Sequence, residues 1–336
     1  MKFIKTLIKI VIKKVFITMK QLNFLIIMDP IEHINYKKDT SLAMMWSAQD
    51  RGHSLGYCQI HDLWLDRGQL MIDAQPVMVK RDPQDFYTLG DKATVPVTDY
   101  DVILMRKDPP FDMRFIYTTY MLDHAKAAGV LVVNDPQAIR DFNEKLFATW
   151  FSDYMSPTIV TSKQAHIRQF ITEQQDVIVK PLDGMGGTGI FRLTADSPNI
   201  GVTIEVLTEL ETLPIMAQRY LPEIVEGDKR VLIVDGSVVE FCLARIPRKG
   251  ETRGNLAAGG SGVAMPLTDI ERQVAEVVAP IVKQKGLMFV GLDLIGGRIT
   301  EINVTSPTCV REIDDQCGTD IATDFIIAIE QKISNM

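Results

Sequence analysis

Short apolar runs alternate with helical patterns along the first part of the chain. Continuous apolar segments of this length are typical of strands buried in a parallel sheet, and they occur at residues 22–28 and 101–105. Further short strands are expected at residues 54–59 and 130–133. Helical patterns cover residues 40–50 and 115–128, between these runs. Such an alternation predicts an open parallel sheet, in which ligands bind beyond the carboxyl ends of the strands.

Three charged residues follow strands of this expected sheet. Asp29 comes after the first run, and the pair Arg106-Lys107 comes after the run at 101–105. Charged loop residues are usually only solvated. For the two cations we favour a functional role, because anionic substrates need basic groups at this edge.

The middle of the chain carries a glycine-rich turn after a strand. Asn134-Asp135-Pro136 marks a boundary, and we expect a helix containing residues 143–145 to follow it. A strand from Val177 carries Lys180 and leads into glycines at 184, 186, 187 and 189. The pattern is neither that of the P-loop nor that of dinucleotide-binding folds, so a phosphate-covering turn and a plain hairpin tip both remain open.

A second glycine-rich segment lies in the last third. Residues 231–235 and 238–244 predict two strands joined by a turn at Asp235-Gly236. Residues 247–262 then hold five glycines, two arginines and one lysine, which predicts a mobile loop that closes over phosphate. Helices are expected at 269–285 and 320–333.

Two acidic residues flank a turn at Gly296-Gly297. A two-residue loop would pair Asp293 with Thr300, whereas a three-residue loop that includes Arg298 pairs Asp293 with Glu301. We favour the three-residue loop, because it gathers the neighbouring apolar side chains on the opposite face. Facing carboxylates repel each other, so a hard cation with Asn303 as a third oxygen ligand is predicted, Mg²⁺ or Mn²⁺ rather than zinc. The alternative is a solvated hairpin.

Composition narrows the class of protein. A chain of 336 residues is expected to form two or three domains, and 46% hydrophobic with 24% charged residues is typical of soluble globular proteins. The net charge of −7 argues against a nucleic-acid partner. The four cysteines show no CxxC spacing, so we expect reduced thiols and a cytoplasmic protein.

Residues 1–18 differ from the rest. Lysines lie along one helical side and apolar residues along the other, so the segment is neither a signal peptide nor a membrane span. A basic amphipathic helix on a membrane surface is one interpretation. We favour a leader outside the native chain, with the true start at Met19 and no membrane partner.

Taken together, these segments resemble the ATP-grasp ligases, and specifically the bacterial type of glutathione synthetase. The blocks that carry the resemblance lie at residues 28–30, 105–112, 143–146, 180–187, 227–232, 244–247, 250–260, 291–296 and 300–312. It implies an α/β protein in which an N-terminal open parallel-sheet domain precedes a two-lobed ATP-grasp fold. The expected divisions are a substrate-binding domain at 19–141, a small lobe at 142–215 and a C-terminal lobe at 216–336 with a catalytic loop at 246–262.

The resemblance also implies residue roles. ATP is expected to contact Lys145, Lys180, Gly184, Gly186, Gly187, Gln218, Tyr220, Leu221 and Asp228. The metal ligands are expected to be Asp293, Glu301 and Asn303, and the catalytic cations Arg230, Arg245 and Arg253. Substrate binding is expected of Asp29, Arg106, Lys107, Asn255, Ser306 and Arg311.

The implied reaction joins γ-glutamylcysteine to glycine with ATP through an acyl phosphate, and the implied assembly is a homotetramer. Two alternatives remain. One is another ATP-dependent carboxylate–amine ligase, such as a D-alanine or glutamate ligase, against which blocks 250–260 and 306–312 speak. The other is a nucleotide-binding protein without turnover, which the intact metal ligands and Arg230 disfavour.

Overall fold

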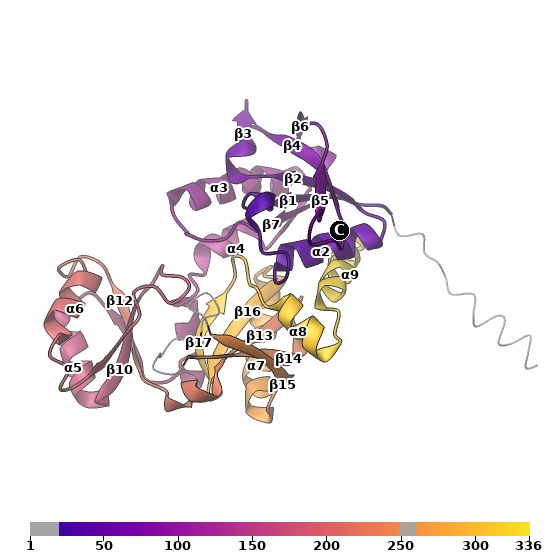
Figure 1. Cartoon of the computed structure of the whole chain (residues 1–336). Coiled ribbons are helices and arrows are strands. Elements are labelled where there is room, and N and C mark those ends of the chain that lie inside the picture. The colour runs from indigo at the N-terminus through magenta and orange to yellow at the C-terminus, as the bar shows by residue number, and fades with distance from the viewer. Residues whose placement is uncertain (1–19, 249–253, 255–259) are drawn as a thin grey trace, which may run out of the picture.

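Three β-sheets and their helices build the protein. The computed structural model describes residues 20–248, 254 and 260–336, so the leader and most of the loop at 246–262 lie outside the described residues. Figure 1 shows the first sheet at the top, the small lobe with α5 and α6 at the left, and the third sheet with α7 and α8 below the first.

The first sheet confirms the predicted parallel arrangement. Its strand order is β3-β4-β2-β1-β7-β8, and the pairs β1–β2, β1–β7 and β7–β8 are parallel. The parallel strands are β1 (Asn23–Ile27), β2 (Ser54–Cys58), β7 (Val102–Met105) and β8 (Leu131–Val133), and the helices of this part are α2 (Thr40–Asp50), α3 (Met113–Ala127) and α4 (Pro136–Asp141). Short 3-10 turns lie at η1 (Ile31–His33), η2 (Ile60–Asp62) and η3 (Val97–Asp99).

An antiparallel extension of this sheet was not predicted. It consists of β3 (Leu63–Asp66), β4 (Gln69–Val79), β5 (Tyr87–Leu89) and β6 (Ala93–Pro96). Along β4 buried and more exposed positions largely alternate, as in a strand with one face on the core. The alternation of apolar and polar residues along 69–79 is the sequence pattern that indicates this strand.

The small lobe has its own sheet and core. The strand order is β11-β10-β12-β9, and all three pairs are antiparallel. Its elements are β9 (Thr158–Thr161), α5 (Gln164–Gln174), β10 (Asp176–Pro181), β11 (Phe191–Thr194), α6 (Ile200–Leu207) and β12 (Ile215–Arg219). One face of the sheet packs on α5 and α6 around Ile167, Val179 and Ile204, so the opposite face remains for a ligand.

The third sheet has the order β15-β14-β13-β16-β17, with antiparallel pairs throughout. Its part of the chain contains η5 (Pro222–Glu226), β13 (Asp228–Val234), β14 (Ser237–Ile246), β15 (Ser261–Pro266), α7 (Asp269–Gln284), β16 (Phe289–Ile295), β17 (Arg298–Asn303), α8 (Val310–Cys317) and α9 (Ile321–Ser334). The turn at Asp235-Gly236 and the helices at α7 and α9 confirm the sequence predictions.

The predicted helix over residues 143–145 is wrong. These residues form a turn between α4 and η4 (Phe147–Tyr154). Asn143 Oδ1 accepts hydrogen bonds from the backbone N–H groups of Lys145 and Leu146, at 3.1 and 3.0 Å. An asparagine side chain that binds the backbone in this way competes with helical hydrogen bonds, which explains the break.

The predicted three-residue hairpin loop is also wrong, although the pairing that it was meant to give is present. The loop is the two-residue turn Gly296-Gly297, with Ile295 opposite Arg298. Both glycines have positive φ, 55° and 71°, as tight hairpin turns of this kind require. A β-bulge at Thr300 absorbs the extra residue, so Asp293 still pairs with Glu301.

The first domain and the C-terminal lobe share one hydrophobic core. Helix α9 packs against α2, and the two lie side by side in Figure 1. Asn134, buried after β8, donates to the carbonyl oxygens of Phe289 and Val304, both at 2.8 Å, and accepts from Phe289 N–H at 2.9 Å. These contacts hold the first sheet against the third.

The segment that contains α4 and η4 packs with the third sheet. Phe142, Phe147 and Phe151 join the core formed by α7 and strands β13, β16 and β17. We expected residues from 142 onward to belong to the small lobe, whereas the small lobe's own core begins at Ile167. Packing therefore assigns residues 142–155 to the larger lobe.

No helix in the described part of the chain is long and apolar enough to cross a membrane.

Glu330 on α9 provides a test of this packing. Its carboxylate accepts from Arg51 at 2.7 and 2.6 Å and lies 2.8 Å from His53 Nε2, and its side chain is 3% exposed. Burial alone would raise the pKa of Glu330, but hydrogen bonds from Arg51 and His53 outweigh it and lower the pKa. A carboxyl group with a lowered pKa stabilises the folded state above its ordinary pKa of 4.5, and this contribution is lost as the pH falls through the lowered value.

Replacing Glu330 with Gln is expected to lower the free energy of unfolding by about 2–3 kcal/mol at pH 7. The loss should shrink as the pH falls below 4.5. The carboxyl group of Glu330 then becomes protonated in the unfolded wild-type chain, whereas in the folded chain it stays ionised until the pH reaches its lowered pKa. Urea unfolding at several pH values measures both quantities, with Glu276→Gln on the exposed face of α7 as the control. An equal loss at every pH would contradict the ionic contribution.

Candidate active site

A small cavity of about 100 Å³ lies between the small lobe and the third sheet. Its lining includes eight of the nine residues expected to bind ATP, namely Lys180, Gly184, Gly186, Gly187, Gln218, Tyr220, Leu221 and Asp228. The glycines lie in the loop between β10 and β11, and Gly186 and Gly187 have φ of 63° and 84°. Such a conformation favours glycine and leaves backbone N–H groups open to a phosphate.

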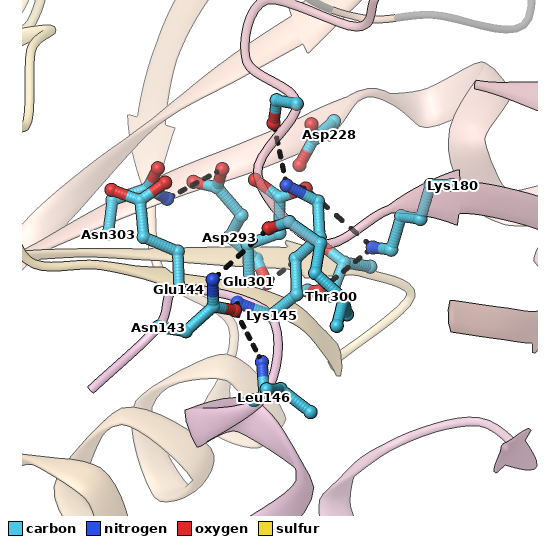
Figure 2. Close-up of polar contacts among 12 residues, drawn as sticks. Asn143, Glu144, Lys145, Leu146, Lys180, Asp228, Asp293, Thr300, Glu301 and Asn303 are labelled. Atoms are coloured by element: carbon cyan, nitrogen blue, oxygen red, sulfur yellow. Dashed lines mark hydrogen bonds and ion pairs between the residues drawn. The ribbon is translucent and has the colours of Figure 1, made fainter. Parts of the chain in front are cut away.

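The ninth residue, Lys145, lies beside the same loop. Its side chain is buried, and Nζ donates to the carbonyl oxygen of Gly184 at 2.7 Å and lies 3.5 Å from Glu301 Oε1. Lys180 Nζ donates to the carbonyl oxygen of Thr300 at 3.1 Å and lies 3.7 Å from the same Glu301 oxygen. Two lysines from different parts of the chain thus meet at one carboxylate, as Figure 2 shows.

The rest of this cavity suits a planar, partly apolar group. Ile178, Ile190 and Ile224 contribute to its walls. Gln218 is 4% exposed, and its Nε2 has no hydrogen-bond partner among the described residues. A buried amide N–H₂ group without a partner is costly, so the cavity favours a ligand with a hydrogen-bond acceptor at this point.

A larger cavity of about 430 Å³ adjoins the first, because Gly186 and Glu301 line both. Its walls come from the first domain, through Asp29, Asp39 and Asp108, and from the third sheet, through Arg230, Arg245, Asp293 and Asn303. Residues Thr305 to Cys309 and Glu312 close the remaining side. A ligand in this cavity would meet a ligand of the smaller cavity at Glu301.

Asp293 and Glu301 lie opposite each other on β16 and β17, as predicted from the sequence, with Asn303 further along the same face. Basic side chains neutralise both acids. Arg230 contacts Asp293 through Nε at 2.5 Å and Nη2 at 3.0 Å, and Arg245 Nη2 lies 2.9 Å from Asp293 Oδ2. The facing carboxylates therefore do not by themselves require a metal ion, which corrects the sequence argument.

Charge and burial shift the pKa values of several groups here. Burial would raise the pKa of Asp293, but Arg230 and Arg245 outweigh it and hold that pKa well below its ordinary range. Burial raises the pKa of Asp228 to about 6, although Arg245 lies 2.6 Å from its carboxylate. The pKa of Lys180 is lowered by burial, which Glu301 only partly offsets. The pKa of Glu144 is raised by burial and by the charge of Glu301.

The donor set on the hairpin fits a hard divalent cation. Asp293, Glu301 and Asn303 offer only oxygen ligands, and Mg²⁺ typically takes one or two carboxylates together with water and phosphate oxygens. The part of the chain that the structure describes contains no group of three or more His, Cys, Asp or Glu residues arranged to hold a metal. A cation here would therefore need further oxygen ligands from water or from a bound substrate.

Three of the residues expected to bind substrate do not line the larger cavity. Arg106 is buried and donates to Ser41 Oγ at 3.1 Å and to the carbonyl oxygen of Pro307 at 2.9 Å. Arg311 donates to the carbonyl oxygen of Tyr36 at 2.8 Å. Lys107 forms an ion pair with Asp29 at 2.9 Å. All four contacts involve the first domain, and two of them, Arg106–Pro307 and Arg311–Tyr36, join it to the segment that follows β17.

Asp29 and Ser306 do line the larger cavity, as the sequence prediction requires. Ser306 Oγ donates to the carbonyl oxygen of Arg106 at 3.2 Å. Arg253 and Asn255 lie outside the described residues. The proposed roles of all these residues remain predictions.

Sequence reasoning missed four carboxylates of the larger cavity, Asp39, Asp108, Glu144 and Glu312. Glu144 accepts from Thr305 Oγ1 at 3.0 Å, and Glu312 has a buried Oε2 without a hydrogen-bond partner in the described part of the chain. Both lie in blocks that carried the family resemblance, at 143–146 and 300–312. Their position in those blocks was the only hint in the sequence of a role at the site. The fold shows that both residues line the larger cavity.

The fold places the chain among the ATP-grasp proteins. Among solved structures, D-cycloserine synthetase DcsG matches with a TM-score of 0.66 at 14% identity, over 92% of this chain and 99% of that one. The ATP-grasp ligase PsnB, in complex with a minimal precursor, Mg and ADP, matches with a TM-score of 0.59 at 17% identity, over 93% and 98%. At these identities the likeness concerns the fold.

Sequence comparison gives the family. Residues 22–140 match the N-terminal domain of prokaryotic glutathione synthetase, and residues 144–318 match its ATP-grasp domain. Glutathione synthetase of Pseudomonas syringae pv. tomato is 56% identical over 92% of this chain and 97% of its own length, and that of Escherichia coli K12 is 52% identical over 92% and 98%. The chain belongs to the prokaryotic glutathione synthetase family.

Membership of this family makes the protein an ATP-dependent ligase that forms glutathione. It also implies the use of a divalent metal. The sequence-based recognition, the fold class and the enzyme class are thereby confirmed.

Proposed function

We propose that the protein joins γ-glutamylcysteine to glycine through an acyl phosphate, with the nucleotide in the smaller cavity and the two amino-acid substrates in the larger one. The observation that carries this proposal is the position of Glu301, which lines both cavities and contacts Lys145 and Lys180. The γ-phosphate of ATP would lie at this junction, where a carboxylate from the larger cavity can reach it.

The smaller cavity supports the nucleotide assignment. The base would lie against Gln218, Tyr220 and Leu221, with Asp228 toward the ribose. The phosphates would meet Lys145, Lys180 and the loop of Gly184, Gly186 and Gly187. Two buried lysines and a glycine-rich loop offer the cationic charge and the N–H groups that phosphates need.

The metal would be Mg²⁺ or Mn²⁺, held by Asp293, Glu301 and Asn303 together with phosphate oxygens. When bound, such an ion neutralises charge on the transferred phosphoryl group. The oxygen-only donor set of the hairpin supports this assignment.

Phosphoryl transfer begins with the cysteinyl carboxylate of the dipeptide. One of its oxygens bonds to the γ-phosphorus, the bond from that phosphorus to the bridging oxygen breaks, and ADP leaves. Arg230 and Arg245, together with Arg253, would stabilise the negative charge that develops on the phosphoryl group. A protein nucleophile is not required, so the work of the chain is to position the reactants and to supply positive charge.

Acyl transfer follows. The amine of glycine attacks the carbonyl carbon of the acyl phosphate, the new C–N bond forms, and the C–O bond to phosphate breaks. Inorganic phosphate leaves and the amine loses a proton. The loop at 246–262 would exclude water from the acyl phosphate, a role that rests on its sequence.

The larger cavity would hold the dipeptide and glycine. Asp29, Ser306 and Glu312 line it, and the buried Oε2 of Glu312 suits an ammonium group of an amino-acid substrate. Asn255 is also proposed to contact substrate. Arg106, Lys107 and Arg311 would then act by fixing the cavity walls from the first domain.

We also propose that the working chain starts at Met19 and that its substrate-binding domain ends at residue 141. The small lobe, expected at 142–215, has its sheet within residues 158–219. A cytoplasmic location and a homotetramer are also proposed. Four reduced cysteines support the first of these, and the resemblance to the family supports the second.

Substrate pairs test the function directly. Phosphate release and peptide formation should require ATP, γ-glutamylcysteine and glycine together. D-alanine or glutamate in place of either substrate should give rates near background. Turnover with a pair of D-alanine molecules would favour the other ligases, and nucleotide binding without phosphate release under any condition would favour a binding protein.

A further inference from the structure

An arginine outside the nucleotide cavity holds the side chain of one of the residues that line it. Arg192 on β11 is not among the lining residues, but its guanidinium group lies 3.6 Å from the ring centroid of Tyr220. The same group donates to both carboxylate oxygens of Asp176 on β10, at 2.9 and 2.6 Å. Three segments of the small lobe thus meet in one contact.

Strand register explains why Arg192 reaches this point. Ile178 pairs with Arg192 on one side and with Gln218 on the other, so the three form one row across β11, β10 and β12. Side chains in such a row share a face of the sheet. Ile178 and Gln218 line the nucleotide cavity, so Arg192 lies at the outer end of the cavity face.

Asp176 fixes the same segment through its backbone. Its carbonyl oxygen accepts from Tyr220 N–H at 2.9 Å, while its carboxylate holds Arg192. Tyr220 is therefore held at its backbone by Asp176 and at its ring by Arg192. Its chain neighbours Arg219 and Leu221 line the cavity with it.

We propose that Arg192 is a positioning residue for the nucleotide: it holds the ring of Tyr220 and thereby sets the geometry of residues 219–221, against which the base of ATP lies. The inference rests on the proposed placement of the base in the smaller cavity. Arg192 also comes two residues after Ile190, at the end of the glycine-rich loop. The contact therefore ties the strand that leaves the phosphate-binding loop to the segment that meets the base.

The exposure of the ion pair favours positioning over stability. The side chains of Arg192 and Asp176 are 39% and 30% exposed, and pairs of this exposure contribute little to folding. A planar guanidinium group that stacks on an aromatic ring and grips a carboxylate with two bonds instead fixes the orientation of that ring. Lysine can keep the charge but cannot reproduce this geometry.

Replacing Arg192 with Leu should raise the KM for ATP and the Kd for Mg²⁺·ADP about tenfold, the loss expected for one well-formed stacking contact. The KM values for γ-glutamylcysteine and glycine should change less than about twofold, because those substrates lie in the other cavity. Arg192→Lys should fall between wild type and Arg192→Leu. Thermal unfolding of both variants should match that of wild type.

A matched control exists in the first domain. Arg81 also grips a carboxylate with two bonds, to Asp50 at 3.3 and 2.6 Å, and also lies over an aromatic ring, that of Trp46 at 5.3 Å. Neither Arg81 nor its partners line either cavity. Arg81→Leu should leave the KM for ATP and the Kd for Mg²⁺·ADP unchanged.

A double-mutant cycle with Tyr220→Leu tests whether Arg192 affects nucleotide binding through the ring of Tyr220. If Arg192 acts through the ring, the double variant should bind Mg²⁺·ADP no more weakly than Tyr220→Leu alone. Additive losses, equal increases in the KM values of all three substrates, or an unchanged Kd in Arg192→Leu would overturn the inference. Failure of the wild-type protein to bind Mg²⁺·ADP would instead overturn the proposed function, so the two failures are distinguishable.

Discussion

Glu301→Gln is expected to reduce kcat/KM by about 10³-fold at ordinary Mg²⁺ concentrations. The carboxylate lies at the junction of the two cavities and within 3.5 and 3.7 Å of Lys145 and Lys180. Its replacement removes a proposed metal ligand and leaves two buried lysines without their shared partner. Glutathione formation measured across a range of Mg²⁺ concentrations tests the prediction.

The fold should survive this substitution, because Glu301 is 22% exposed and its neighbours Thr300 and Ile302 keep their strand pairing. Circular dichroism should therefore be unchanged. The control for the loss of one negative charge is Glu276→Gln on α7. Glu276 is exposed and lines neither cavity. Near-normal activity of Glu301→Gln at limiting Mg²⁺ would contradict the metal assignment.

Arg230→Met is expected to lower both activity and stability. The Arg230 side chain is 7% exposed and holds Asp293, itself 4% exposed, through two hydrogen bonds. Removing one partner of a buried pair leaves an uncompensated charge and typically costs about 3–5 kcal/mol. Because Arg245 also contacts Asp293, we expect the low end of this range, about 3 kcal/mol, in urea unfolding.

The double variant Arg230→Met, Asp293→Leu separates the two losses. Removal of both charges should restore much of the stability, because apolar side chains of similar volume can replace a buried pair. Activity should stay about 10²–10³-fold below wild type in both variants, because each lacks the positive charge that Arg230 is proposed to supply to the transferred phosphoryl group. A double variant as unstable as Arg230→Met, or one that regains activity, would contradict the account.

The sequence predicted the parallel strands well, because continuous apolar runs such as 22–28 and 101–105 depend on burial on both faces. It predicted the pairing of Asp293 with Glu301 but through the wrong loop. A bulge at Thr300 changes the register by one residue, and bulges leave no mark in the period of a short strand. The wrong loop length and the missed bulge each change the register by one residue, so the two errors cancelled and the predicted pairing was correct.

Contacts between distant segments were the least predictable part of the site. Arg106 follows a strand of the parallel sheet, where a substrate-binding cation is expected. Its guanidinium group instead donates hydrogen bonds to Ser41 and to the carbonyl oxygen of Pro307. The sequence around Arg106 does not indicate these partners, because they lie 65 and 201 residues away along the chain. Glu312 faces the larger cavity only because α8 begins at Val310, directly after the segment that closes it.

The central claim is that the dipeptide carboxylate attacks the γ-phosphate at the junction of the two cavities. Its most direct test uses γ-glutamylcysteine labelled with ¹⁸O in the cysteinyl carboxylate, with ATP, Mg²⁺ and glycine, and mass spectrometry of the phosphate released. An acyl phosphate transfers one carboxylate oxygen to phosphate, so each phosphate should carry one ¹⁸O atom when glutathione is formed. Phosphate that carries no ¹⁸O while glutathione forms, with the lost carboxylate oxygen recovered in water or in the nucleotide instead, would contradict the account.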